Sequence, residues 1–506
     1  MNLAQKIAKE STITFFGMVY GNINRYLYTA LLARWVGIEY LGIYALANSI
    51  MLISEVLGKM GMESGVMRFV SRLNIDTDSK NIQKIIASAL KMTASFSLVI
   101  MIGLIFSARY IVTQVLNAQP ILTTVMIVFA VAIPFNALTS VSAFATQGFK
   151  RLKYKTLVIQ FLNPTLLLVS MILCFWFVSM ESAFMAPMLI TGVIVFFVMI
   201  VLLKRVAGVT INQIRQARFD TELLKFSYPL MFIIILQTFM HWMDILMLGY
   251  FTDAATVGLY HPAVRTAGLL NALIVSFISI YAPVMSQLHN EGDFSEMSHL
   301  YKLVSRWMIT FAIPISLVFI IYPSKMMLLF GPDYMAGASV LVILTVATFI
   351  QAAFGAASPA LGMSGFTRLI LWNSLGAFIL NIVLNVALIP KYGILGAAWA
   401  TLISLVAIGI ARVLEVRWIL KLSFISSKMI KPLLAGAVTW WCLWWIRPLV
   451  INFHTLATTG KSSVDMGKLS VLAGVHKYPA RVKCATLAWH TLHSAIHDEN
   501  NVVSTE

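Results

Sequence analysis

Residues 25–47 read RYLYTALLARWVGIEYLGIYALA, and residues 241–263, at an offset of 216, read HWMDILMLGYFTDAATVGLYHPA. Each stretch is an apolar segment that leads into a Gly-x-Tyr unit, which begins at Gly42 in the first and at Gly258 in the second. The match predicts two related halves of about 200 residues, and in a membrane chain such halves are the usual sequence sign of a transporter with its site between them.

The composition predicts an all-α polytopic membrane protein. Of the 506 residues, 59 % are hydrophobic and 11 % are charged, whereas a soluble domain carries roughly 25 % charged residues. Apolar runs of about 20 residues recur along the chain, and each is long enough to cross a hydrocarbon core of roughly 30 Å as a helix. These runs do not alternate, as the strands of a membrane β-barrel would.

The apolar runs predict two lobes of six helices, followed by one or two C-terminal helices. The expected spans are 13–34, 41–60, 86–108, 121–145, 156–178, 183–203, 228–250, 257–281, 304–323, 336–360, 369–389, 394–414 and 430–451. The expected domains are an N-terminal lobe at 1–203, a cytoplasmic linker at 204–227, a C-terminal lobe at 228–414, an additional transmembrane helix within 415–452, and a polar tail at 453–506 that is disordered or not native.

The basic residues predict the orientation of the chain. About 24 Lys and Arg residues fall in the N-terminal tail and in every second loop after it, against about four in the intervening loops, which by the positive-inside rule places the N-terminus in the cytoplasm. This topology and attraction to anionic lipid account for most of the +17 net charge. No nucleic-acid partner is expected, because the basic residues are scattered over loops.

Several missing patterns favour transport over chemistry. The sequence has no G-x-x-x-x-G-K-[ST] phosphate loop, and no His, Cys and Glu cluster has metal-ligand spacing. Cys174, Cys442 and Cys484 are expected to be unpaired. The predicted outward loops before residue 452 are too short for a catalytic site. We therefore predict a transporter with no catalytic residue, no metal and no cofactor.

Two arginines lie inside predicted helices, one in each half. Arg25 is about twelve residues into the first helix, which places it roughly 18 Å deep at 1.5 Å per residue. Arg265 lies in the eighth helix, and both should face the bundle interior, where an arginine needs a partner or water. Because guanidinium matches phosphate oxygens in a bidentate way, the two arginines are predicted to bind a pyrophosphate. Structural ion pairs, such as Arg265 with Asp244, are the alternative.

His241 and Asp244 are three residues apart on the seventh predicted helix and share one face. Under the repeat, His241 takes the position of Arg25. Both residues are predicted to line the cavity, where an imidazole or a carboxylate can bind H⁺ or Na⁺ and couple transport to an ion gradient. The alternatives are an interior histidine with a structural role and an ion pair between Asp244 and Arg265.

The second predicted helix carries Glu55 and Lys59 one turn apart, in the order that favours a local ion pair. Glu55 is also a candidate for the cavity wall and for ion coupling, while Lys59 and Arg68 are candidates for the cytoplasmic entrance. The topology alone also explains Arg68. Among the prolines inside helices, Pro262 is predicted to be a bending point, because it precedes Arg265 by three residues.

Several degenerate motifs occur in a characteristic order over residues 1–450. They are Leu41-Gly42-Ile43-Tyr44-Ala45, Arg68-Phe69, Gln147-Gly148-Phe149-Lys150-Arg151, Asp244-x-x-Met247-Leu248-Gly249, Val257-Gly258-Leu259-Tyr260 and Tyr392-Gly393-Ile394-Leu395-Gly396-Ala397-Ala398. On these motifs the chain resembles the polysaccharide-biosynthesis and O-antigen flippase family. That family belongs to the superfamily that also holds the multidrug and toxic-compound extruders and the lipid II flippases.

The resemblance implies two six-helix lobes around a central cavity, with alternating access. It implies that an oligosaccharide linked to a polyprenyl pyrophosphate of the undecaprenyl type is flipped across a bacterial inner membrane. The implied partners are membrane lipid, a polysaccharide polymerase and a chain-length regulator. Related lipid II flippases use cationic cavity residues in the first and eighth helices, which Arg25 and Arg265 match by position.

The end of the chain departs from this family. Members commonly have fourteen helices, whereas residues 453–506 are polar and contain no spanning run. After thirteen helices this basic tail would lie outside the cell, against the charge rule. Either 430–451 does not span fully, or the tail comes from an unrelated reading frame.

Two other functions compete with a flippase. An ion-coupled multidrug or cation antiporter of the same fold predicts a mainly acidic cavity, against which the two arginines argue. A membrane polysaccharide polymerase or ligase predicts a large outer loop with catalytic residues, which the sequence does not show.

Overall fold

The computed structural model describes residues 3–73, 78–149, 152–424 and 429–442. These residues are helical almost throughout and contain no strand. Eleven of the described helical segments are long and apolar enough to cross a membrane, so the prediction of an all-α polytopic membrane protein is confirmed.

The chain divides into two units, Met1–Ser427 and Lys428–Glu506. In the second unit the structure describes one helix at 429–442. The last predicted span, 430–451, therefore lies only partly within the described residues, and the tail at 453–506 lies outside them.

The N-terminal half comprises the helices up to α7. Its members are α1 (Leu3–Lys59), α2 (Met62–Arg72), α3 (Ser79–Tyr110), η1 (Ile111–Val115), α4 (Ile121–Gly148), α5 (Leu152–Thr156), η2 (Leu157–Leu162), α6 (Asn163–Phe177) and α7 (Met180–Ala207). The short α8 (Ile211–Gln216) follows in the predicted linker and begins with a capping box between Thr210 and Gln213.

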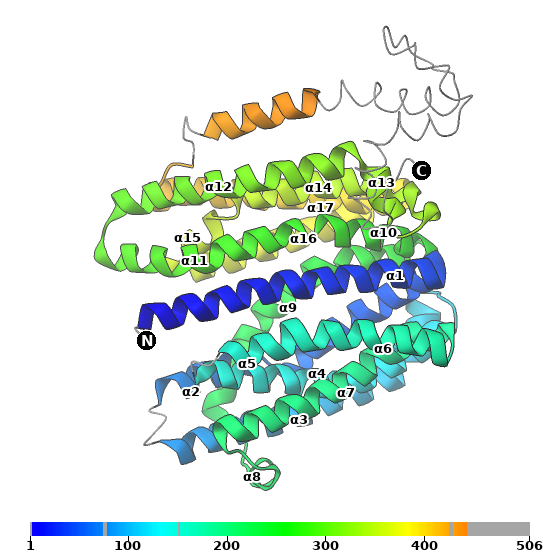
Figure 1. Ribbon diagram of the computed structural model, residues 1–506, viewed down its shortest axis with the longest axis vertical. Coiled ribbons are helices and arrows are strands. Elements are labelled where there is room, and N and C mark those ends of the chain that lie inside the picture. Colours follow the sequence, from blue (N-terminus) through cyan, green and yellow to red (C-terminus); the bar gives the residue numbers. More distant parts are fainter. Residues whose placement is uncertain (1–2, 74–77, 150–151, 425–428, 443–506) are drawn as a thin grey trace, which may run out of the picture. The chain divides into compact units, whose positions relative to one another are not determined.

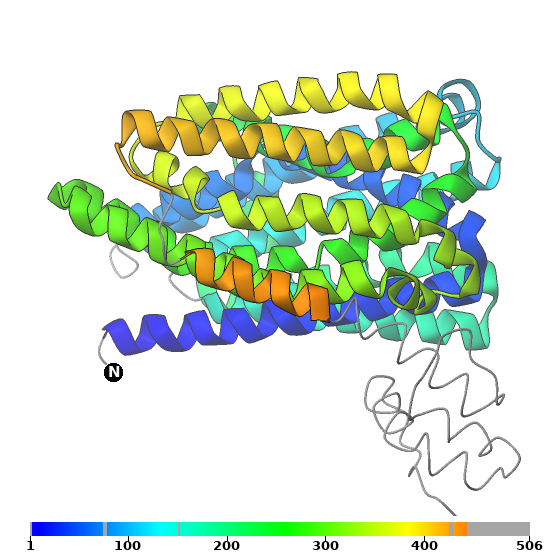
Figure 2. The same cartoon turned by 90° about the horizontal axis from the view of Figure 1, so that it is seen from above.

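The C-terminal half comprises the helices from α9 to α17. Its members are α9 (Thr221–Phe251), α10 (Ala254–Ala267), α11 (Leu270–Glu291), α12 (Phe294–Ile321), α13 (Pro323–Leu328), η3 (Pro332–Gly337), α14 (Ala338–Phe354), α15 (Ala357–Met363), α16 (Thr367–Tyr392) and α17 (Ile394–Ile419). In Figure 1, α1 lies between α4, α6 and α7 on one side and α10 and α16 on the other. Figure 2, seen from above, shows α16 and α17 side by side.

The first two predicted helices run into each other. Residues 13–34 and 41–60 were expected to be separated by a loop, but α1 continues from Leu3 to Lys59 and is interrupted only at Gly37. The φ angle of Gly37 is +80°, a conformation that costs glycine little and other residues much. A single glycine therefore replaces the expected loop.

The eighth predicted helix is two helices. The expected span 257–281 is divided between α10 and α11, with the break at Gly268 and Leu269. α10 continues through Pro262 to Ala267, and Thr266 Oγ1 donates to the carbonyl oxygen of Pro262 at 2.8 Å. The role of Pro262 as a bending point stays a prediction.

The glycines of the two Gly-x-Tyr units bring the halves into contact. A Cβ atom on Gly42 would lie 1.7 Å from the carbonyl oxygen of Ala254, and one on Gly258 would lie 1.9 Å from that of Ile38. Each glycine thus allows α1 and α10 to approach backbone to backbone. At the same end of these helices, Arg34 Nε donates to the carbonyl oxygen of Leu329 at 2.8 Å.

A second contact between the halves lies where α1 ends and α2 begins. A Cβ atom on Gly61 would lie 2.2 Å from the carbonyl oxygen of Ser227, and one on Gly65 would lie 2.0 Å from Ser227 Oγ. These glycines seat α2 of the N-terminal half against α9 of the C-terminal half. Cys174 and Cys442 are free, as expected, while Cys484 lies outside the described residues.

Candidate functional site

Three cavities form a row through the bundle. The N-terminal cavity, of about 350 Å³, shares Arg25, Trp242 and Arg265 with a central cavity of about 170 Å³. The central cavity in turn shares His241 and Asn271 with a C-terminal cavity of about 430 Å³. Because the central cavity shares lining residues with each of the other two cavities, a ligand in it would touch side chains that also line the N-terminal and C-terminal cavities.

Arg25 of α1 and Arg265 of α10 line the same two cavities. Arg25 donates from Nη2 to the carbonyl oxygen of Ile159 at 3.1 Å and from Nη1 to Gln160 Oε1 at 3.4 Å. Both acceptors belong to η2, so this segment holds the Arg25 side chain in place. Among the described residues neither arginine forms an ion pair with a carboxylate. In the central cavity, two positive charges therefore face one space whose described lining includes no carboxylate.

Arg265 is oriented by two residues that the sequence analysis did not single out. His261, one turn earlier on α10 and fully buried, accepts the Arg265 Nε–H on Nε2 at 3.2 Å. Because a guanidinium can only donate, His261 Nε2 must be unprotonated, and the neutral ring carries its proton on Nδ1. The ring of Trp242 lies 5.4 Å from the guanidinium carbon, within the range of a cation–π contact.

Asp244 lies in a network of neutral hydrogen-bond donors. Tyr260 Oη donates to Asp244 Oδ2 at 2.9 Å, and Thr401 Oγ1 donates to the same oxygen. Asn385 Nδ2 donates to Oδ1 at 2.8 Å, with Asn381 Nδ2 at 3.4 Å. The proposed alternative of an ion pair between Asp244 and Arg265 is therefore wrong for the part of the chain that the structure describes.

His241 lies on the wall shared by the central and C-terminal cavities. Its ring is exposed and meets the ring of Trp242 edge-on, with 5.0 Å between the centroids. Both His241 and Arg25 line the central cavity, in keeping with their matched positions in the repeat. The interpretation of His241 as a cavity residue therefore agrees with the geometry, while its role in ion coupling stays a prediction.

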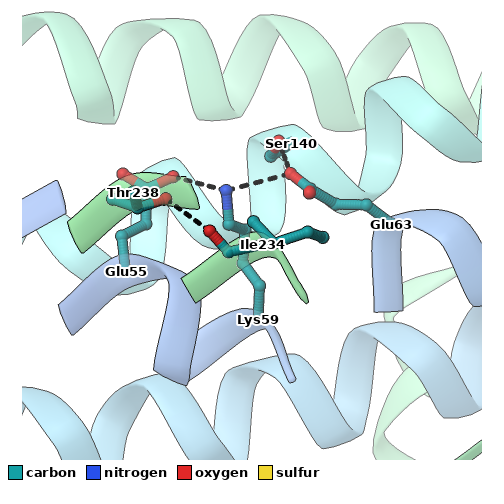
Figure 3. A network of polar contacts seen from close by, with 6 residues as sticks. All are labelled: Glu55, Lys59, Glu63, Ser140, Ile234 and Thr238. Atoms are coloured by element: carbon teal, nitrogen blue, oxygen red, sulfur yellow. Dashed lines mark hydrogen bonds and ion pairs between the residues drawn. The ribbon is translucent and has the colours of Figure 1, made fainter. Parts of the chain in front are cut away.

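Glu55 and Lys59 form the predicted local ion pair, and a second carboxylate completes it (Figure 3). Lys59 Nζ lies 3.1 Å from Glu55 Oε1 and 3.0 Å from Glu63 Oε1, and Ser140 Oγ donates to Glu63. The Lys59 side chain is only 13 % exposed. Glu55 lines the N-terminal cavity, whereas the entrance role of Lys59 stays a prediction.

Arg68 lies on α2, away from the three cavities. It is exposed, and its guanidinium carbon lies 4.1 Å from the centre of the Phe226 ring at the start of α9. Arg68 thus joins the contact between α2 and α9. Its role at the cytoplasmic entrance stays a prediction.

No group of three or more His, Cys, Asp and Glu side chains in the described residues is placed to hold a metal ion. The polar residues that the sequence analysis missed are neutral ones, namely Tyr260, His261, Asn381, Asn385 and Thr401. One local signal was available for two of them, because Asn381 and Asn385 are one turn apart in an apolar helix and share a face. Tyr260 belongs to the second Gly-x-Tyr unit and His261 lies one turn before Arg265, whereas Thr401 meets the site only through the fold.

The site therefore belongs to a helical membrane protein with a cationic cavity between two halves. The family model described as "Polysaccharide biosynthesis protein" matches residues 31–336, more than half of the chain, and the chain belongs to this family. It is similar to the lipid II flippase MurJ in an inward closed conformation, with a TM-score of 0.71 and 14 % identity, over 97 % of this chain and 100 % of that one. At this identity the likeness shows the fold alone.

Two curated proteins are similar to parts of the chain. The probable flippase AglR of Haloferax volcanii is 28 % identical over 170 residues, which cover 32 % of this chain and 35 % of the relative. The zinc-dependent sulfurtransferase SufU of Bacillus subtilis is 49 % identical over 37 residues, which cover 7 % of this chain and 25 % of SufU. The chain thus spans about a third or less of the length of these two relatives.

Proposed function

We propose that this chain is a flippase that moves a polyprenyl-pyrophosphate-linked oligosaccharide, such as an O-antigen or other surface-polysaccharide repeat unit, across the cytoplasmic membrane. Family membership and the name of the flippase AglR support a role in moving lipid-linked glycans. The proposed mechanism is alternating access, in which the two halves rock about the cavities. The glycine contacts just after the Gly37 interruption of α1 and at the start of α2 are the places where the halves would separate and close.

The observation that carries the proposal is the pair of arginines, one from each half. Arg25 and Arg265 line the same two cavities and lack carboxylate partners among the residues described. An uncompensated arginine inside a membrane is costly, and an anionic ligand would supply the missing charge. A pyrophosphate fits, because its oxygens can accept bidentate hydrogen bonds from both guanidinium groups. The lipid tail would remain in the bilayer while the polar head passes.

We further propose that an ion gradient drives the movement through Asp244. This carboxylate is the negative group in a buried cluster of oxygen-bearing side chains, and the buried Asn385 Oδ1 beside it has no hydrogen-bond partner. Carboxylate, amide and hydroxyl oxygens suit a hard cation, and a proton is the other candidate. Glu55 and His241 remain candidates for the same role, although Glu55 is already paired with Lys59.

The proposed setting is a bacterial inner membrane with the N-terminus in the cytoplasm. The scattered basic loops support this orientation. A polysaccharide polymerase and a chain-length regulator are the proposed partners, since a flipped repeat unit must next be joined to others.

The test measures binding and flipping with the full chain in detergent and in proteoliposomes. We expect Arg25→Ala and Arg265→Ala each to weaken the binding of inorganic pyrophosphate at least about tenfold, the effect of losing roughly 1.4 kcal/mol. Flipping of a polyprenyl-pyrophosphate oligosaccharide should fall in parallel. The matched control is Arg109→Ala, because Arg109 is exposed on α3 and lines none of the three cavities. Unchanged flipping in both cavity variants would refute the anion-binding role.

A further inference from the structure

The C-terminal cavity contains an arginine that the proposed pyrophosphate site does not use. Arg412 lies on α17 and lines this cavity, as does Thr401 on the same helix. The two are eleven positions apart, which corresponds to about 16 Å at 1.5 Å per residue. The cavity is therefore elongated along α17, with the Asp244 cluster near Thr401 and the guanidinium of Arg412 toward the other end.

Arg412 has unused capacity to bind an anion. Its Nη2 donates to Ser374 Oγ at 3.3 Å, and its buried Nε has no partner. Glu415, one turn further along α17, accepts instead from Asn373 Nδ2 at 2.6 Å. No ion pair to Arg412 occurs among the described residues. Because the side chain faces a cavity and donates to Ser374 of α16, it does not simply extend along the helix toward the membrane surface.

The rest of the wall offers the groups that recognise hydroxyls. The cavity volume of about 430 Å³ falls in the usual range for small-ligand sites, roughly 300–1,000 Å³. Polar side chains that line it include Gln237, Asn271, Gln351, Ser358 and Ser374. Amides and hydroxyls both donate and accept, which suits a ligand that carries many hydroxyl groups.

We infer that the C-terminal cavity binds the sugar portion of the cargo, and that Arg412 binds a carboxylate on an acidic sugar within it. The inference rests on the proposed function, because the central cavity of Arg25 and Arg265 shares His241 and Asn271 with the C-terminal cavity. A pyrophosphate in the central cavity would leave the attached sugars next to that shared wall. The transported glycan would then contain a uronic acid or a similar acidic residue.

Saturation-transfer NMR on the purified full chain can test this with three probes, namely methyl glucuronide, methyl glucoside and glycerol 3-phosphate. The glucuronide should show at least about five times the signal of the glucoside, and Arg412→Gln should remove this preference. Arg412→Lys, which keeps the charge, should retain part of it. Arg417→Gln is the matched control, because Arg417 is exposed on the same helix.

The binding of inorganic pyrophosphate is measured on the same samples. This measurement shows that each variant is folded, and it separates the proposed sugar site from the proposed pyrophosphate site. We expect pyrophosphate binding to survive Arg412→Gln and glucuronide binding to survive Arg25→Ala. Equal signals from glucuronide and glucoside, or a preference unaffected by Arg412→Gln, would overturn the inference. A signal from glycerol 3-phosphate that exceeds that of glucuronide and depends on Arg412 would also overturn it, since the ligand would then be a lipid headgroup. If the unaltered protein did not bind pyrophosphate, that result would instead count against the proposed function.

Discussion

The two halves each bury carboxylates, but they compensate the charge in different ways. In the N-terminal half, Lys59 bridges Glu55 and Glu63 at 3.1 and 3.0 Å. In the C-terminal half, the described residues that donate hydrogen bonds to Asp244 are all neutral, among them Tyr260 and Asn385. A lysine pairs with the carboxylates of the first network, whereas no ion pair to Asp244 occurs among the described residues.

The two networks therefore call for different roles. Breaking a buried ion pair leaves an unpaired charge and is costly, so the N-terminal network is suited to holding α1, α2 and α4 together. When it is ionised, a carboxylate held by neutral donors carries a negative charge that a proton or Na⁺ would neutralise. We therefore expect the first network to contribute stability, and we have proposed that the second couples transport to an ion; paired substitutions can separate these roles.

The largest effect is expected from Lys59→Met. The substitution leaves the buried Glu55 and Glu63 without their ion-pair partner, and breaking such a pair typically costs about 3–5 kcal/mol. Thermal unfolding of the detergent-solubilised protein should show a clear loss of stability. The exposed Lys225 on α9 provides the control Lys225→Met, which should change little. If Lys59→Met had the same unfolding temperature as the unaltered protein, the network of Lys59, Glu55 and Glu63 would not stabilise the fold.

A second experiment compares Asp244→Asn with Glu55→Gln. Asp244→Asn keeps the shape of the side chain but removes its charge, so flipping in proteoliposomes should lose its dependence on a Na⁺ or H⁺ gradient. The gradient-driven rate should fall at least about tenfold, or roughly 1.4 kcal/mol. Glu55→Gln leaves Lys59 paired with Glu63 and should preserve the dependence. A loss of coupling in Glu55→Gln alone would transfer the ion site to the N-terminal half.

Hydropathy predicted most helices well because each apolar run ends at polar residues. The predicted span 183–203 corresponds to α7, Met180–Ala207. The errors fall where the chain changes direction without leaving the apolar pattern. Gly37 interrupts α1 within one residue, and the break between α10 and α11 is equally short. No polar loop marks either place. Hydropathy therefore predicted a loop between residues 34 and 41 where only Gly37 interrupts the helix, and it predicted no break within 257–281.

The candidate site was predictable in its charges and not in its neutral partners. Arg25, Arg265 and Asp244 are conspicuous in the sequence because ionisable residues are rare inside membrane helices. Apart from Tyr260, the groups that donate to Asp244 are ordinary asparagine and threonine side chains, which lie 137 to 157 residues further along the chain. The packing of α9 against α16 and α17 brings them to Asp244, and no sequence spacing links them to that carboxylate.

The smallest expected effects come from removing one donor from each network, in Ser140→Ala and Thr401→Val. Ser140 Oγ donates to Glu63, and Thr401 Oγ1 donates to Asp244. A hydrogen bond to a charged group is typically worth about 1.5–3 kcal/mol. Each variant therefore removes one hydrogen bond to a carboxylate, Ser140→Ala in the N-terminal network and Thr401→Val in the C-terminal network.

The two deletions should affect different measurements. Ser140→Ala should lower the unfolding temperature and leave the ion concentration for half-maximal flipping unchanged, because Lys59 still neutralises Glu63. Thr401→Val should shift that ion concentration, because it removes the Thr401 Oγ1 atom, which is one of the oxygens around the proposed ion at Asp244. If both variants changed only the unfolding temperature, the C-terminal network would be structural like the N-terminal one. Ion coupling would then have to reside elsewhere, and His241 would be the next residue to replace.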